Sequence, residues 1–195
     1  MKKPTTREMK EAVRIILRGI GEDPEREGLQ DTPRRFISAL EEVTLGSKVN
    51  EEKVLKTLFD AEGYDDMIVL DGIPFQSTCE HHLLPFVGKA DVGYIPGPSG
   101  RIFGISKLAR VVELYAKRLQ NQERITKQVA EALMRAGDLK GVAVVLQASH
   151  MCMVCRGIRK PGSRMSTSKM EGAFRYNASA RSEFFELCKR RGREG

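Results

Sequence analysis

The chain has 195 residues, 41% of them hydrophobic, which allows one or two domains with a sizeable core. Its net charge of +7 indicates an anionic partner: nucleic acid, a membrane surface or a phosphorylated small molecule. Aromatic residues make up only 6%, and no apolar run approaches the roughly 20 residues of a membrane span, so a base-stacking nucleic-acid platform and a transmembrane segment are not expected.

The first third of the sequence, residues 1–62, predicts a region made of helices. Apolar residues recur at helical spacing from Thr6 to Ile20, and Thr32 followed by Pro33 is typical of an N-cap and the first turn of a second helix. The segment before the first helix is polar and has no signal-peptide core, so we expect a cytoplasmic protein. The helices expected here span residues 6–20, 32–45 and 51–59.

From residue 63 onward the pattern changes to strands. Polar and apolar residues alternate from Phe86 to Ile95, which is typical of a half-buried strand, and a return strand at residues 101–105 completes an expected hairpin. Further strands are expected at residues 67–70, 141–154 and 164–174, with a turn at 71–72. Strand pairs joined by turns favour an antiparallel sheet with helices on one face, which is an α+β fold.

Helices are also expected in the middle and at the end of this second region. Ser106 is the predicted cap of a long amphipathic helix, and the polar residues 120–124 interrupt it, so we expect two consecutive helices. Ser179 is the predicted cap of the last helix. The sequence therefore predicts an N-terminal helical region at residues 1–62 and a second domain of strands and helices at residues 63–195.

Cysteine and histidine lie together in two clusters. Residues 77–82 read Ser-Thr-Cys-Glu-His-His, and residues 149–152 form the second cluster, Ser-His-Met-Cys. Four cysteines are too few for a disulfide scaffold, so we expect reduced thiols. Thiolate and imidazole are ligands that suit zinc. Cys79 and His82, joined by Cys152 from the second cluster, would leave the fourth tetrahedral position open, as in catalytic sites. His81 is left as a general acid or base beside the metal.

A closed structural zinc site is the competing interpretation. Cys79 and His82 with Cys152 and Cys155 have the spacing of a Cys3His site. Because side chains alternate along a strand, we expect His150 and Cys152 on one face and Cys155 on the other. This alternation favours the open site, with His150 as a second general acid or base.

Basic residues suggest an anion-binding function near this site. Lys107 and Arg110 lie one turn apart at a predicted helix start, whose free N–H groups favour an anion, although a solvated basic face is the alternative. Arg156 follows Cys152 at even spacing, which would place it on the metal face of the strand. Glu123 is either a helix cap or an acceptor for the guanidine-like edge of a purine.

Four motifs resemble those of GTP cyclohydrolase I in order and spacing. They are Ser77–His82, Gly104–Arg110, Gln122–Thr126 and His150–Met153. The resemblance runs from about Thr6 to the last helix. It implies a tunnelling fold, with a four-stranded antiparallel sheet and two long helices on one face, assembled as a homodecamer of two stacked pentamers with active sites at subunit interfaces.

The resemblance also implies the reaction: hydrolysis of GTP at C8, loss of formate, and rearrangement to 7,8-dihydroneopterin triphosphate. The triphosphate accounts for the basic charge without nucleic acid or a membrane. The implied roles are zinc binding by Cys79, His82 and Cys152; proton transfer by His81 and His150; guanine binding by Glu123 with Gln122; triphosphate binding by Lys107, Arg110, Arg156 and a neighbouring subunit's Arg35; and assistance to ribose rearrangement by Ser106. Some members carry a lysine where this chain has Ser38, which leaves the cross-subunit contact to Arg34 and Arg35.

Two other functions fit parts of the pattern. A non-catalytic, zinc-stapled protein that binds phosphorylated ligands would need Cys155 as a fourth ligand. A related tunnelling-fold enzyme acting on pterins or deazapurines would share the fold but use a different metal or nucleophile pattern.

Overall fold

The computed structural model describes residues 2–189 and divides the chain into two compact units, Met1–Thr44 and Leu45–Gly195. This boundary lies before the 62/63 division expected from the sequence. Residues 45–62 join the second unit because Leu55 is buried in its core and Leu58–Asp60 form a strand within it.

The N-terminal unit contains α1 (Thr6–Gly19), η1 (Glu27–Leu29) and α2 (Thr32–Val43). A capping box fixes the start of α1: the Thr5 hydroxyl accepts from the Glu8 N–H, and the Glu8 carboxylate accepts from the Thr5 N–H. Pro33 occupies the first turn of α2 as predicted, but the N-cap is Asp31 instead of Thr32. Asp31 makes no cap bond, because its carboxylate pairs with arginines of the same helix.

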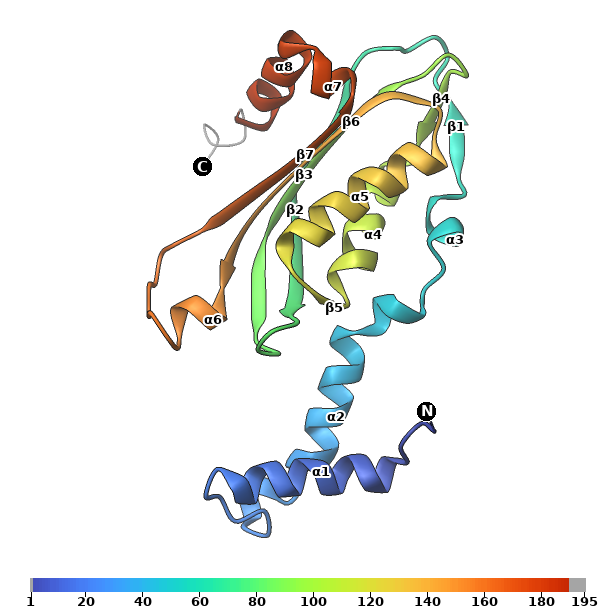
Figure 1. Cartoon of the computed structure of the whole chain (residues 1–195). Helices are drawn as coiled ribbons and strands as arrows, with labels where there is room; N and C mark the ends of the chain where they lie inside the picture. The colour runs from blue at the N-terminus through green and yellow to red at the C-terminus, as the bar shows by residue number, and fades with distance from the viewer. Residues whose placement is uncertain (1, 190–195) are drawn as a thin grey trace. The chain divides into compact units, whose positions relative to one another are not determined.

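The second unit is an α+β fold built on one main sheet (Figure 1). Its elements are η2 (Leu45–Lys48), α3 (Glu51–Leu55), β1 (Leu58–Asp60), β2 (Ile68–Cys79), β3 (Pro85–Pro96), β4 (Arg101–Phe103), α4 (Ile105–Ala116), β5 (Leu119–Gln120), α5 (Gln122–Ala136), β6 (Leu139–His150), α6 (Met151–Val154), β7 (Met165–Gly172), α7 (Ala173–Tyr176) and α8 (Ala178–Lys189).

The main sheet has the order β5-β2-β3-β6-β7. Its four long strands are antiparallel, and the two-residue β5 joins β2 in parallel. Helices α4 and α5 lie against one face, α4 over β2 and α5 over β6 and β7 (Figure 1). The predicted tunnelling-fold arrangement of four antiparallel strands and two helices is therefore confirmed.

The core lies between this sheet and the two helices. Phe86 and Val92 of β3, Val111 of α4 and Leu133 of α5 are completely buried. Burying one such side chain contributes about 1.5–3 kcal/mol to folding. The hydrophobic layer therefore fixes how α4 and α5 sit on the sheet, and with them the site residues that they carry.

Two strand predictions were wrong. The expected turn at residues 71–72 is a β-bulge, where the β2–β3 register shifts between Leu70 and Ile73, and β2 continues to Cys79. The expected hairpin at residues 86–105 does not form either, because β4 pairs with β1 in a separate two-stranded sheet. The third helix accordingly ends at Leu55, before β1 begins.

The predicted interruption between the two central helices is confirmed. α4 ends at Ala116, and α5 begins at Gln122 after the N-cap Asn121. Ser106, however, is not a cap, because α4 begins at Ile105 after Gly104 and has no side-chain cap.

At the C-terminal end, Asn177 takes the capping position predicted for Ser179. Its Oδ1 accepts from the N–H groups of Ser179 and Ala180 at the start of α8. β7 ends at Gly172, and the predicted last strand residue Phe174 lies in α7. Across the described residues, no helix combines the length and the apolarity that a membrane crossing requires.

Candidate active site and metal centre

The turn between β2 and β3 carries the first cluster. Cys79 is the last residue of β2 and is 5% exposed. Its N–H donates to the Leu84 carbonyl and its carbonyl accepts from the Leu83 N–H, both at 2.8 Å. Leu83 adopts a φ of 55°, a left-handed conformation that costs a leucine about 1–2 kcal/mol. The tight turn holds His82 close to Cys79.

The three predicted metal ligands come together. The ligand atoms of Cys79, His82 and Cys152 all lie within 4.8 Å of one another, and Cys79 Sγ lies 3.9 Å from His82 Nδ1. Tetrahedral zinc with the usual bond lengths separates sulfur from nitrogen by about 3.6 Å and two sulfurs by about 3.8 Å. The donor set and its spacing therefore fit a zinc ion after shifts of less than about 1 Å.

Cys152 reaches the metal group from a helix and not from the strand that was predicted. β6 pairs with β3 as far as His150, opposite Phe86, and with β7 as far as Ala148, opposite Met165. The chain beyond His150 has no partner strand and forms the short helix α6.

The strand alternation expected for residues 150–156 is therefore wrong. Arg156 lies beyond α6 and is exposed, so it shares no strand face with His150 or Cys152. Cys155 is also exposed, and its Sγ donates to the Met151 carbonyl at 2.9 Å. Within residues 2–189, the metal group includes Cys152 and not Cys155.

The protonation of Cys152 depends on its surroundings. Burial raises the pKa of this thiol, the neighbouring Cys79 raises it further, and Arg156 acts in the opposite direction. A positive ion among these sulfurs would favour the thiolates.

His150 sits at the end of β6 in a fixed orientation. Its ring stacks on Phe86 with centroids 4.5 Å apart and an interplanar angle of 4°, and its Nε2 lies 2.9 Å from Gln122 Oε1. Burial lowers the pKa of His150, an effect that Glu123 partly opposes. The imidazole is therefore held in its neutral form to lower pH than an exposed histidine.

Gln122 determines which nitrogen of His150 carries the proton. The Gln122 Nε2 lies 3.0 Å from the carbonyl oxygens of both Leu146 and Met165, and only an NH2 group can donate to them. The other end of the amide is therefore an acceptor, and His150 must donate from Nε2. Its Nδ1 is left as the basic nitrogen.

This arrangement differs from the predicted guanine-binding role of Gln122. The side chain is completely buried and its amide is used within the chain, also contacting Thr167 Oγ1 at 3.1 Å. Thr167 continues to Thr126, whose hydroxyl donates to the Gln122 carbonyl. Neither threonine was predicted to support Gln122, since nothing in the sequence links Thr126 to the distant Thr167. Glu123, in contrast, is exposed in the first turn of α5.

The predicted triphosphate and ribose residues do not join the metal cluster within one chain. Ser106 and Lys107 lie in the first turn of α4, and Arg110 follows one turn later. It is the C-terminal end of α4 that leads into β5, the strand that pairs with Cys79 (Figure 1). Because ten residues of an α-helix rise about 15 Å, the first turn of α4 lies at the end of the helix away from the metal cluster. Arg35 lies in the separate N-terminal unit and pairs with Asp31.

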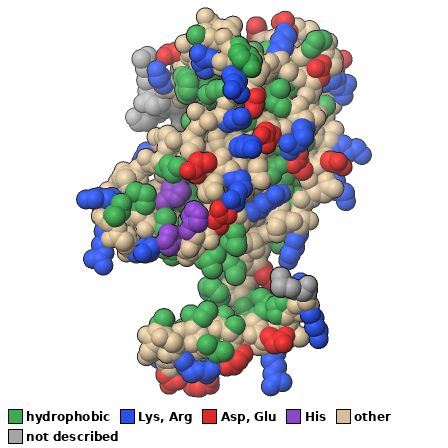
Figure 2. All heavy atoms as spheres, viewed as in Figure 1, with side chains coloured by type: hydrophobic (Ala, Val, Ile, Leu, Met, Phe, Trp, Pro, Cys, Tyr) green, Lys and Arg blue, Asp and Glu red, His purple; other side chains and the backbone are tan. Residues whose placement is uncertain are grey.

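His81 completes the cluster at the surface. Its side chain is 66% exposed, and its Nε2 lies 3.7 Å from Glu80 Oε1. Figure 2 shows the histidine side chains gathered in one area of the second unit, bordered by acidic and basic groups.

Comparison with known proteins identifies the family. The family model described as GTP cyclohydrolase I matches residues 9–189. This chain belongs to the GTP cyclohydrolase I family. It is 53% identical over 180 residues to GTP cyclohydrolase 1 of Mycolicibacterium vanbaalenii, covering 92% of this chain and 89% of that protein. It is 50% identical over 184 residues to GTP cyclohydrolase 1 of Dehalococcoides mccartyi, covering 94% and 97%.

Among solved structures, the crystal structure of the archaeosine synthase QueF-Like in the apo form matches at 16% identity. The match has a TM-score of 0.46 and covers 56% of this chain and 96% of that chain. The family model and the two relatives confirm the GTP cyclohydrolase I resemblance expected from the four motifs, and the protein is an enzyme of this family.

Proposed function

We propose that this GTP cyclohydrolase uses zinc to hydrolyse GTP at C8, releases formate and forms 7,8-dihydroneopterin triphosphate. The observation that carries the proposal is the convergence of Cys79, His82 and Cys152 in a chain of this family. Three protein ligands leave one tetrahedral position for the reaction. Zinc in such a site supplies a Lewis acid that lowers the pKa of water to about 7.

The chain's own residues would orient the substrate and move protons. His150 offers Nδ1 as a base, because its Nε2–H is committed to Gln122. His81, exposed beside the metal group, would exchange protons with the opening ring and with solvent. The Glu123 carboxylate would accept hydrogen bonds from the guanine edge, while the Gln122 amide would hold the His150 ring in place.

The remaining roles require a second subunit. Lys107 and Arg110 would bind the triphosphate at the start of α4, where helix N–H groups also favour an anion, with Ser106 near the ribose. Since this end of α4 is far from the metal cluster of the same chain, GTP would bridge two subunits. Arg156 would approach the phosphates from the metal side, and Arg35 from a neighbouring subunit. We infer a cytoplasmic homodecamer on the family pattern, with no nucleic-acid or membrane partner.

The decisive experiment combines zinc content with product formation on one sample. Purified protein loaded with Zn²⁺ is incubated with GTP, and formate and the fluorescent oxidised pterin are measured. Cys79→Ser should lose both metal and activity, whereas Cys155→Ser should keep both. Zinc-replete protein that releases no formate would refute the proposal, and zinc loss in Cys155→Ser would restore the closed-site interpretation.

Mixing two inactive variants tests the shared site. Cys79→Ser and Lys107→Ala subunits, unfolded and refolded together, should regain part of the activity, because some interfaces then combine one intact metal cluster with one intact α4. No recovery in properly assembled mixtures would place both residue sets in a single-subunit site.

A further inference from the structure

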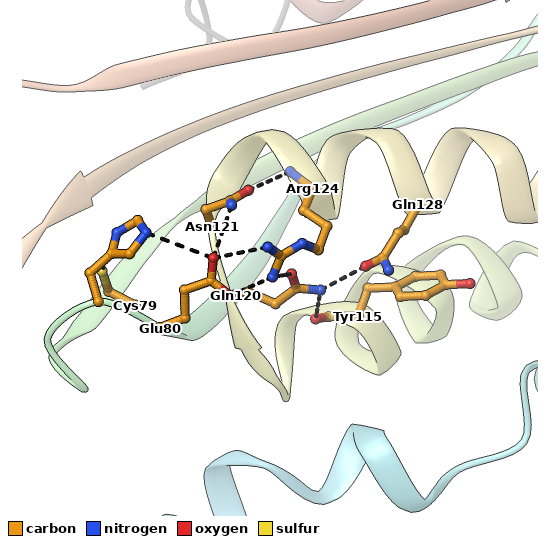
Figure 3. A network of polar contacts seen from close by, with 8 residues as sticks. Cys79, Glu80, Tyr115, Gln120, Asn121, Arg124 and Gln128 are labelled. Carbon is orange, nitrogen blue, oxygen red and sulfur yellow. Dashed lines mark hydrogen bonds and ion pairs between the residues drawn. The ribbon is translucent and has the colours of Figure 1, made fainter.

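Glu80 lies between a metal ligand and a proton-transfer residue. Its own N–H donates to the Gln120 carbonyl at 2.9 Å, which extends the short β2–β5 pairing by one residue. Its carboxylate accepts two hydrogen bonds from Arg124, from Nη1 at 2.5 Å and from Nη2 at 2.9 Å. Figure 3 shows Glu80 facing Arg124 and Asn121 across the gap between the strand end and α5. A bidentate contact of this kind fixes the orientation of the carboxylate as well as its distance from the guanidinium group.

The partner side of this contact is itself rigid. Asn121 accepts from the Arg124 N–H through Oδ1 at 2.8 Å and donates from Nδ2 to Glu80 at 3.3 Å. The buried Gln120 lies beneath, donating to the Tyr115 carbonyl and to Gln128 (Figure 3). Glu80 is therefore tied to β5 by its backbone and to the start of α5 by its side chain.

The same turn of α5 contacts His150 directly and His81 through Glu80. Gln122, two residues before Arg124, binds His150. The His81 ring lies between Glu80 Oε1, 3.7 Å from Nε2, and Cys79 Sγ, 3.9 Å from Nδ1. Residues 121–124 thus bind His150 through Gln122, and they bind Glu80, which contacts His81 and follows the metal ligand Cys79, through Asn121 and Arg124.

We propose that Glu80 and Arg124 are positioning residues, which hold the metal-binding turn and the His81 ring in register with the start of α5. This inference rests on the proposed metal site. Neither residue touches the metal group directly; each acts through Cys79 or His81. Residues that orient metal ligands in this way typically change metal affinity or activity by about 10–100-fold when they are replaced.

The alternative is an ordinary surface ion pair. Such pairs contribute about 0–1 kcal/mol to stability and nothing to chemistry. The Lys117–Glu113 pair provides the matched control, since it is also short, at 2.6 Å, and partly exposed, but joins Glu113 of α4 only to the C-cap residue of the same helix. A positioning role and a stabilising role therefore make different predictions for the two pairs.

The test uses the full-length protein with Glu80→Gln, Arg124→Gln and the control Lys117→Gln. Zn²⁺ affinity is measured by competition with a chromophoric chelator, and Co²⁺ substitution reports tetrahedral geometry by its visible absorption. We expect both site variants to bind Zn²⁺ about 10–100-fold more weakly, with kcat reduced more than KM is changed. Lys117→Gln should match the wild type, and circular dichroism checks that every variant is folded.

Two further variants keep the outcome decisive. Arg124→Lys retains the charge but loses the bidentate contact, so its Zn²⁺ affinity should lie between those of wild type and Arg124→Gln. The double variant Glu80→Gln/Arg124→Gln should be no weaker than either single variant, because the pair acts as a unit. Zn²⁺ affinity within twofold of wild type in folded Glu80→Gln and Arg124→Gln would overturn the inference. Wild-type protein that binds Zn²⁺ but forms no formate would overturn the proposed function alone.

Discussion

Replacing Gln122 by alanine should disable His150 without removing any metal ligand. The Gln122 amide shares its two donor hydrogens among the Leu146 and Met165 carbonyls and Thr167 Oγ1, and its oxygen accepts from His150 Nε2, so the change removes the equivalent of three full hydrogen bonds. At about 1 kcal/mol each, the free energy of unfolding should fall by about 3 kcal/mol. Without the bond to Gln122, the His150 ring can rotate and change its tautomer, so kcat should fall with little change in KM.

Three measurements check this prediction. Urea denaturation gives the stability, steady-state kinetics give kcat and KM, and ¹⁵N NMR of the imidazole reports which nitrogen carries the proton. Gln147→Ala is the matched control, because that exposed glutamine makes one long bond to Ser166, at 3.3 Å, and should change stability by less than about 0.5 kcal/mol. A Gln122→Ala protein with wild-type kcat and an unchanged Nε2–H signal would refute the reasoning.

Other parts of the second unit give predictions that concern stability. Tyr115 donates a hydrogen bond to Glu51, and its pKa is raised from 10.0 to about 12, first by burial and then by that carboxylate. Because the unfolded chain loses this proton at lower pH than the folded protein, the free energy of unfolding should fall as the pH rises from 10 to 12, by up to about 1.4 kcal/mol per pH unit. Tyr115→Phe should abolish this slope in denaturation curves. Ser77→Ala should be neutral or stabilise by up to about 1 kcal/mol in urea melts, because among the described residues the Ser77 hydroxyl is the only buried side-chain polar atom without a partner; a clear loss of stability would contradict this. Gly172→Ala should cost at least about 2 kcal/mol by the same assay, since φ is 55° and a Cβ would lie 2.2 Å from the Lys140 carbonyl oxygen, whereas Gly162→Ala, with open space around it, should cost less.

The metal group was predictable from the sequence because the information is chemical. Cysteine and histidine are few in this chain, and a Cys-x-x-His pair in a turn can face one ion whatever the exact backbone. The turn that joins Cys79 to His82 needs only local hydrogen bonds. The alternating pattern from Phe86 to Ile95 likewise identified a central strand, because one of its faces is buried by α4 and α5.

The errors came from partners that are distant in the sequence. Residues 151–154 are apolar and read as a strand, but no neighbouring strand extends far enough to pair with them. The 101–103 strand chose β1 over β3 because β3 is already paired on both edges. The use of the Gln122 amide could not be foreseen, since its direction is set by carbonyl groups 24 and 43 residues away.

The hydrogen-bonded chain that begins at His150 Nε2 determines how protons can reach and leave this imidazole. It runs from the imidazole through the Gln122 amide to two threonine hydroxyls and ends on a backbone carbonyl. An amide, unlike a carboxylate, neither gains nor loses charge in the physiological pH range. The hydrogen-bonded chain therefore cannot carry a proton into the interior, and a proton taken up at His150 Nδ1 must leave from the same nitrogen. Each catalytic cycle would then be reset from the open, solvent-facing side of the cluster.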